Sequence, residues 1–462
     1  MSGNFPISAA SLAVPHLSSS IVFFLLIMGI PVMICEFGIG RGSRRSAARS
    51  FDILEPKGTR WHHFKWISII GCYMLMMYYT TVTGWMLYYC YLHFIGTFVG
   101  AAPKTVVATF GAMLQSPRTM GFWMILACLF GFVVCFFGIQ NGVERITKFM
   151  MVLLLGLMVI LAVHSLFLEG AEAGIRFYLV PNIDALAKIG WGNVIFAAMS
   201  QAFFTLSIGI GAMLIFGAYL PHGRSLLGEA VTITALDTFV ALMAGFIIIP
   251  ACFAYGIKPD AGPSLIFLTI PNLFVKMPGG QIWGMLFFIF LSFAALSTVI
   301  AVFENIIAFG MNLKGWTRRK SVLINIVLII SLSLPCVLGF NLWSDFQPLG
   351  PGSGVLDLED FIVSNNLLPL GSLVFVLFCT KKNGWGWERF LAEANEGTGM
   401  NVPSGIKNYL MYGLPFFILV IYLKGYYDMF MPQGLAVFVK WLFMAACFLG
   451  FIIYGSTGRK TE

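Results

Sequence analysis

Residues that could bind a cation occur at close spacing inside one long apolar stretch, LFFIFLSFAALSTVIAVFENIIAF. Ala294, Ser297 and Thr298 are spaced i, i+3 and i+4, so on a helix they lie on one face. Two hydroxyls and a reachable carbonyl would supply part of the oxygen shell that a hard cation requires. The alternative is that both hydroxyls bond back to the preceding turn, as Ser and Thr do in membrane helices.

A second stretch, MSQAFFTLSIGIGAMLIFGAYL, has Ser207, Gly209 and Gly211 near its middle. The two glycines are two residues apart, which is not the four-residue spacing of close helix packing. We predict that the helix unwinds here, because freed backbone groups at membrane depth are tolerated where they face a cavity and hold ions or polar substrate groups. The alternative is a continuous helix that glycine only makes more flexible.

Three acidic residues, Glu36, Asp237 and Glu304, also lie within apolar runs. A charge near the centre of a bilayer costs about 2.5 to 3.5 kcal/mol or more, so each acid requires a reason. For Glu36 and Asp237 the position favours a functional environment. For Glu304 a functional role and a structural one, in which the acid is protonated or bonded to a neighbouring helix, are equally supported.

The elements that must position these residues are membrane-spanning helices. Of the 462 residues, 59% are hydrophobic and 10% are charged, against roughly 45 to 50% and about 25% in soluble domains. Continuous apolar runs exclude a closed β-barrel, whose segments are short and alternating. We predict an all-α polytopic membrane protein with eleven transmembrane helices, at residues 21–39, 66–94, 122–139, 149–167, 191–220, 230–255, 282–311, 322–342, 361–379, 409–423 and 435–454.

The net charge of +8 follows the topology and does not indicate nucleic-acid binding. Basic residues gather between residues 41 and 65 and between residues 314 and 320, and the positive-inside rule makes both loops cytoplasmic. Alternation then places the carboxyl terminus inside and the amino terminus of this chain outside. We expect a short uncharged segment at 1–20, a single transmembrane transporter domain at 21–455 and a cytoplasmic tail at 456–462.

The nine cysteines lie in or against apolar runs without a Cys-x-x-Cys pair, which favours packing over metal binding or disulfides. No Asn-x-Ser/Thr acceptor occurs, which favours a bacterial protein over one from an animal cell surface.

Several segments resemble the neurotransmitter:sodium symporter family. FFTLSIGIGA and FAALSTVIA are similar to its sixth and eighth helices, and the similarity extends to YYTTVTGW, GIPVMICEFGIGRG, LDLEDF and GWGWERFLAEANEG. It covers the chain from about Ile21 onward. The resemblance implies a LeuT-like inverted-repeat transporter fold in the cell membrane and sodium-coupled symport of an amino acid by alternating access.

The resemblance also implies a central substrate pocket. Tyr79 would donate its hydroxyl to the substrate carboxylate, Phe204 would cover the pocket on the outer side, and Ser207 with the unwound backbone would bind the main-chain groups. The side-chain pocket would be apolar, so we expect a neutral, hydrophobic amino acid. Its lining residues would be Leu75, Ile210 and Val302, and Thr205 and Thr298 would lie at the edge of the substrate.

Two sodium sites follow from the same resemblance. Thr205 and Asp237 match the first, and Ala294, Ser297 and Thr298 match the second. Glu36 would brace the backbone of the broken helix, and Asp360 would be the acidic half of an outer gate. Because Asp237 replaces the Asn common in the family, its carboxylate could offset the sodium charge, and we expect no chloride requirement.

The first helix of the family is not recognisable. Residues 1–20 lack its Gly-Asn-x-x-Arg-Phe-Pro signature, and that helix supplies oxygens to both sodium sites and the basic half of the outer gate. We therefore consider two explanations, a truncated gene model and a naturally shortened relative that binds substrate or regulates without transport. A polypeptide limited to the remaining helices is expected to bind sodium weakly and to be inactive in transport.

Other classes are less well supported. A channel should show a repeated pore filter, a membrane enzyme should gather His, Cys and carboxylate groups at one membrane face, and a nucleotide-driven pump should carry a GxxxxGK[ST] loop. None of these patterns is visible in the sequence. We expect a transporter and not an enzyme, whose partners are a small amino acid and the lipid bilayer.

Overall fold

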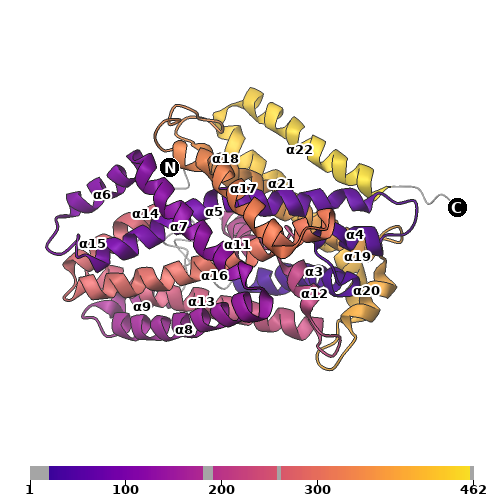
Figure 1. Ribbon diagram of the computed structural model, residues 1–462, viewed down its shortest axis with the longest axis horizontal. Coiled ribbons are helices and arrows are strands. Elements are labelled where there is room, and N and C mark those ends of the chain that lie inside the picture. Colours follow the sequence, from indigo (N-terminus) through magenta and orange to yellow (C-terminus); the bar gives the residue numbers. More distant parts are fainter. Residues whose placement is uncertain (1–19, 181–190, 258–261, 458–462) are drawn as a thin grey trace.

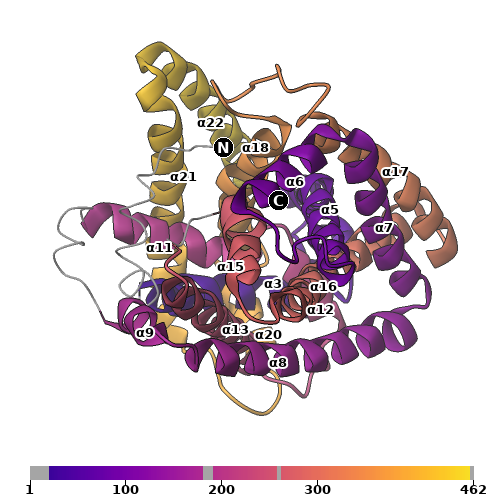
Figure 2. The ribbon, with the colours of Figure 1, turned by 90° about the vertical axis from the view of Figure 1, so that its left-hand side faces the viewer.

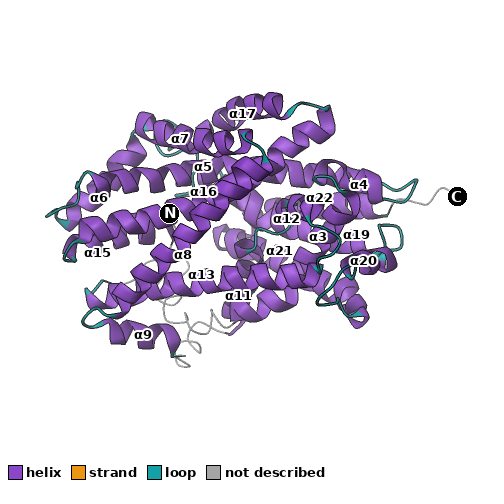
Figure 3. Cartoon of the chain, turned by 60° about the horizontal axis from the view of Figure 1, so that its bottom comes forward, coloured by secondary structure: helices purple, strands orange, loops and turns teal. Residues whose placement is uncertain are grey.

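The computed structural model describes residues 20–180, 191–257 and 262–457, and the regular elements in these ranges are all helices (Figure 1, Figure 3). The elements of the first part are η1 (Leu25–Gly29), α3 (Ile30–Ser43), α4 (Ala47–Leu54), η2 (Trp61–Phe64), α5 (Lys65–Phe94), α6 (Pro103–Gln115), α7 (Pro117–Phe136), η3 (Ile139–Glu144), α8 (Arg145–Leu166), α9 (Ala171–Leu179), α11 (Trp191–Thr205) and α12 (Ala212–Tyr219).

The second part begins after α12 and includes several helices whose first turn is a π-helix. Its elements are α13 (Leu226–Ala254), α14 (Gly262–Ser264), η4 (Leu265–Thr269), α15 (Ile270–Lys276), α16 (Gly280–Lys314), α17 (Arg318–Leu338), α18 (Val355–Asp360), η5 (Phe361–Leu367), α19 (Leu368–Thr380), α20 (Trp387–Ala394), η6 (Ser404–Ile406), η7 (Tyr409–Gly413), α21 (Leu414–Phe430), η8 (Met431–Gln433) and α22 (Leu435–Ser456).

Ten helical stretches of the described chain are long and apolar enough to cross a membrane. Each corresponds to one of the predicted runs, and the remaining run, 191–220, is divided between α11 and α12. The prediction of an all-α polytopic membrane protein is therefore confirmed. The predicted segment 1–20 lies outside the described residues except for Ser20, and the predicted tail 456–462 does so except for Ser456 and Thr457.

Several helices are longer than the apolar runs that predicted them. The run at 409–423 ends where Lys424 begins, but α21 continues to Phe430, and within this extension Lys424 Nζ and Asp428 Oδ2 pair at 2.7 Å one turn apart. The run at 361–379 is preceded by α18, which begins at Val355. The backbone N–H of Gly354 donates to Asp357 Oδ2 at 2.6 Å, so an acidic side chain stabilises the first turn.

Two helix pairs form the centre of the molecule. α5 packs along α16, and α3 packs along α12. Figure 2 shows these helices surrounded by α7 and α17 on one side, α8 and α13 on a second, and α21 and α22 on a third. Among the polar residues predicted from the sequence, Glu36 lies on α3 and Glu304 on α16, and both are buried in the protein.

The two ends of the molecule carry different segments. α4, α20 and the described carboxyl end lie at the right in Figure 1, and α6, α9 and α15 lie at the left. We call the first the basic end, because it contains the basic loop between residues 41 and 65. Each long helix therefore runs between the basic end and the opposite end.

Candidate functional site

The predicted unwinding of the fifth run is confirmed. α11 ends at Thr205 and α12 begins at Ala212, and the residues between them are not helical. Ser207, Gly209 and Gly211 have φ angles of 49°, 101° and 73°, which lie in the left-handed region that favours glycine. A Cβ atom on Gly209 would lie 2.0 Å from the Leu368 carbonyl oxygen, so glycine is also required by the close approach of α19.

Side chains from two central helices form hydrogen bonds with backbone groups at this break. Glu36 of α3 is fully buried and accepts hydrogen bonds from the N–H groups of Gly209 at 2.5 Å and Met213 at 3.2 Å. Asn305 of α16 donates from Nδ2 to the Gly211 carbonyl at 3.1 Å. Backbone N–H groups and a backbone carbonyl at the break are therefore both hydrogen-bonded, as buried backbone groups require.

Asn305 was not among the residues that sequence reasoning singled out. It is fully buried and follows Glu304 directly within an apolar run. A second polar residue at that depth was the available signal, because buried amides are nearly always hydrogen-bonded. The identity of its partner could not be read from the sequence, since Asn305 and Gly211 are 94 positions apart.

The residues assigned to the first sodium site meet beside the break. Thr205, the last residue of α11, donates from Oγ1 to Asp237 Oδ2 of α13 at 3.1 Å. The Phe204 carbonyl accepts from the Ser207 N–H at 3.1 Å, and the carboxyl end of a helix carries partial negative charge. A hydroxyl and a carboxylate beside such a helix end are ligand types that a hard cation prefers.

The residues assigned to the second sodium site lie on one face of α16, as their spacing predicted. Ala294 O accepts hydrogen bonds from Ser297 Oγ at 2.8 Å and from Thr298 Oγ1 at 3.4 Å. The structure therefore has the back-bonded arrangement that was the alternative to a cation cage. The same bonds bring three oxygens together, so a cation would find them already converged.

The residues assigned to the substrate come from α5, α11, the break and α16. The Tyr79 hydroxyl faces Thr298, which relates α5 to the face of α16 just described. Ser207 lies in the break, and the three apolar residues Leu75, Ile210 and Val302 are buried in the core. Their exposed fractions are 7% or less, as an apolar side-chain pocket would require.

Phe204 and Asp360 line a cavity of about 320 Å³ between α11 and the α18–η5 segment. Phe204 is 43% exposed. Asp360 accepts hydrogen bonds from Tyr78 Oη at 3.0 Å and from Ser364 Oγ at 2.7 Å, so its carboxylate is held by hydroxyls of α5 and η5. The other lining residues are Phe196, Ala197, Ser200, Gln201, Phe203, Ser364, Asn365, Pro369 and Ile421.

Glu304, the third buried acid, forms an ion pair. Its Oε1 lies 2.6 Å from Arg318 Nη2, and its Oε2 accepts from Arg318 Nη1 at 2.8 Å. Tyr219 Oη lies 3.5 Å from Oε1. This pair joins α16 to α17 next to the end of α12, and it balances the buried charge without a bound ion.

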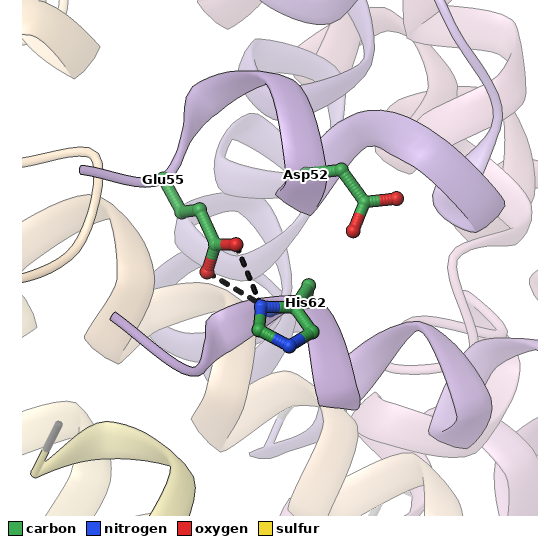
Figure 4. A group of neighbouring side chains, drawn as sticks. All are labelled: Asp52, Glu55 and His62. Atoms are coloured by element: carbon green, nitrogen blue, oxygen red, sulfur yellow. Dashed lines mark hydrogen bonds and ion pairs between the residues drawn. The ribbon is translucent and has the colours of Figure 1, made fainter. Parts of the chain in front are cut away.

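A separate cluster of titratable groups, formed by Asp52, Glu55 and His62, lies at the basic end (Figure 4). Glu55 accepts from His62 Nδ1 at 2.7 Å and from the His62 backbone N–H at 3.1 Å. Asp52 pairs with Lys65 Nζ at 3.1 Å. These bonds close the loop between α4 and α5, and sequence reasoning had not identified this cluster.

Comparisons with known proteins agree with this architecture. The profile described as Sodium:neurotransmitter symporter family matches residues 104–454. The chain is 32% identical over 362 residues to a sodium-dependent transporter of Bacillus subtilis (strain 168), YhdH, with 78% of each chain covered. It is 29% identical over 414 residues to a sodium-dependent transporter of Haemophilus influenzae, covering 87% of this chain and 88% of the relative.

A solved structure has the same overall arrangement. The structure of MhsT in complex with L-phenylalanine superimposes with a TM-score of 0.79 at 32% sequence identity, covering 90% of this chain and 92% of MhsT. Both the sequence profile and the structural similarity extend over most of the helices that surround the break. The chain belongs to the sodium:neurotransmitter symporter family, whose members are transporters and not enzymes.

Proposed function

We propose that this protein is a sodium-coupled symporter of a neutral, hydrophobic amino acid. The observation that carries the proposal is the break between α11 and α12, beside which Thr205 donates to Asp237, together with the oxygens of Ala294, Ser297 and Thr298 that converge on one face of the central helix α16. Freed backbone dipoles beside oxygen ligands at membrane depth suit a cation and a zwitterion together.

The residues have distinct roles in this proposal. Thr205 and Asp237 bind one sodium ion, and a second is bound by the Ala294 carbonyl and the Ser297 and Thr298 hydroxyls, whose oxygens already converge. Tyr79 donates to the substrate carboxylate, and the unwound backbone around Ser207 binds its main-chain groups. Leu75, Ile210 and Val302 contact the side chain. The apolar character of these three residues, and the L-phenylalanine bound by the related MhsT, support a hydrophobic substrate.

Coupling follows from the charge of sodium. One elementary charge that crosses about 100 mV supplies about 2.3 kcal/mol. This free energy supports a concentration ratio of more than tenfold. Substrate and sodium stabilise a closed arrangement. In this arrangement the flanking helices α11 and α12, together with the Phe204 side chain of α11, cover the break. Alternating exposure of the break at the two ends of the molecule then moves both solutes in the same direction.

Uptake by proteoliposomes tests the proposal. We expect labelled L-phenylalanine or L-leucine to accumulate with external sodium and not with external potassium when the protein tested also carries the family's first helix, because the chain without that helix is expected to be inactive in transport. The double variant S297A/T298A removes two sodium ligands, so we expect its half-saturating sodium concentration to rise at least about tenfold. T109A is the matched control, because Thr109 makes the same back bond on the exposed helix α6.

Sodium-independent uptake by the wild type, or equal sodium dependence in S297A/T298A and T109A, would contradict the proposal. Sodium-dependent binding of L-phenylalanine without uptake would favour a binding or regulatory protein instead.

Asp237 supports a further expectation, that transport needs no chloride. Its carboxylate is bonded to Thr205 and can balance the charge of an adjacent sodium ion. We expect uptake to be unchanged when gluconate replaces chloride, and we expect D237N to become slower unless chloride is present. Uptake by the wild type that disappears in gluconate would show the expectation to be wrong.

A further inference from the structure

Glu359 is a buried acid that the proposed transport site does not use. It lies in α18, and 3% of its surface is exposed. Neither carboxyl oxygen has a hydrogen-bond partner within the described ranges, and Glu359 takes part in none of the ion pairs found there. Among the described buried side chains without a hydrogen-bond partner, Glu359 is the one that carries a carboxyl group, and a buried carboxylate without a counter-charge costs far more than a neutral polar group.

The polar groups around Glu359 come from three helices. α18 packs against α5 and α17. α17 contributes the thiol of Cys336, which faces both the Glu359 carboxyl and the Thr81 hydroxyl of α5. Thr81 Oγ1 is itself buried without a partner. A thiol is a weak donor and a hydroxyl can donate or accept, so neither can replace a counter-charge.

The charged neighbours of Glu359 on its own helix are also acidic. Asp357 accepts from the Gly354 backbone N–H, and Asp360 accepts from Tyr78 of α5 and Ser364 of η5. No lysine, arginine or histidine is paired with any of these three acids in the described part of the chain. A third negative charge would therefore be repelled by two others in addition to being desolvated.

Physical chemistry leaves few ligands that could neutralise this carboxyl. An isolated buried carboxylate costs far more than its neutral form, which is why such groups take up a proton. A hard cation would need several oxygen ligands, whereas at this place Glu359 supplies two oxygens without a partner. A proton needs one, and the resulting O–H can donate to the Cys336 sulfur that faces the carboxyl.

We propose that Glu359 is a proton-binding site: its carboxyl carries a proton while α18 packs against α5 and α17, and releases it when this contact opens to water. Asp360, the next residue, lines the cavity beside Phe204, so movement of α18 changes the cavity as well. Low pH stabilises the packed arrangement, and rising pH favours its opening. This inference is independent of sodium binding and substrate identity.

Thermal unfolding of the purified full chain and infrared spectroscopy test the proposal. E359Q and E359M each supply a neutral side chain, and E388Q is the control because the Glu388 side chain is 83% exposed. We expect the apparent Tm of the wild type and of E388Q to fall as the pH rises from about 5 to 9, since unfolding releases a proton. We expect this dependence to be weaker in E359Q and E359M.

The infrared measurement observes the proton directly. We expect a carboxylic-acid C=O band at neutral pH that is present in the wild type and E388Q and is reduced in E359Q and E359M. An unchanged band, or the same pH dependence of Tm in all four proteins, would overturn the proposal. Failure of both neutral variants to fold would overturn it as well, because each reproduces the uncharged state that we assign to Glu359.

Discussion

At the scale of single residues, the buried acids of this protein differ in what they bind. Glu36 is completely buried, and its two oxygens accept from the backbone N–H groups of Gly209 and Met213. Glu304 is neutralised by Arg318. Asp360 is bonded to two hydroxyls, whereas Glu359 beside it has no hydrogen-bond partner in the described structure, and this contrast separates the proposed gate residue from the proposed proton site.

The hydrogen bonds of Glu36 lead to a prediction about stability. E36A would leave two buried backbone donors unsatisfied, and each costs about 1 to 3 kcal/mol. E36Q keeps the size of the side chain but replaces one acceptor by a donor, so we expect an intermediate loss. Thermal unfolding in detergent measures both, with E388Q as the exposed control. A Tm of E36A equal to that of E388Q would show that Glu36 does not hold the break.

At the scale of elements, the break depends on a close contact between two helices. The Gly209 carbonyl would lie 1.8 Å from a Cβ atom on Gly371, and the Leu368 carbonyl would lie 2.0 Å from a Cβ atom on Gly209. The unwound segment and α19 therefore touch backbone to backbone. Small residues allow such approach between membrane helices, so the position of α19 and the geometry of the break are linked.

Substitution of Gly209 tests this link. We expect G209A to lower the stability by more than the roughly 1 to 2 kcal/mol that a left-handed residue costs, because the added methyl group also collides with α19. Binding of L-phenylalanine should weaken in parallel. G156A is the matched control, since a Cβ atom on Gly156 of α8 meets nothing within 4 Å. Equal Tm values and equal binding by the two variants would contradict the prediction.

At the scale of the whole molecule, the distribution of basic residues predicts the orientation. The basic end carries the loop between residues 41 and 65, with α4 and α20 beside it (Figure 1). Two basic residues of this end form ion pairs within the protein. Arg41 donates from Nε to Glu393 Oε1 of α20 at 2.6 Å, and Lys65 pairs with Asp52. The positive-inside rule applies to the basic end whether or not its residues form ion pairs in the folded protein, because the rule acts during membrane insertion.

Fusion reporters at the carboxyl terminus test the orientation. We expect a green fluorescent protein fused after Glu462 to fluoresce when the chain is produced in a bacterial cell membrane, and an alkaline phosphatase fused at the same place to be inactive. The same pair fused within the loop between residues 339 and 354 at the opposite end should give the reverse result. Active phosphatase at the carboxyl terminus would place the basic end outside.

The sequence by itself determined the helical class, the positions of the spans and the unwinding between Thr205 and Ala212. These properties are local, because the length of an apolar run and the backbone freedom of Gly209 and Gly211 act within one segment. Only the tertiary structure decided which groups meet: Glu36 with Gly209, Asn305 with Gly211, and Arg318 with Glu304. It also showed that the Glu359 carboxyl has no hydrogen-bond partner among the described residues. Partners on different helices depend on how far each helix is rotated and shifted, and no spacing along one segment encodes that.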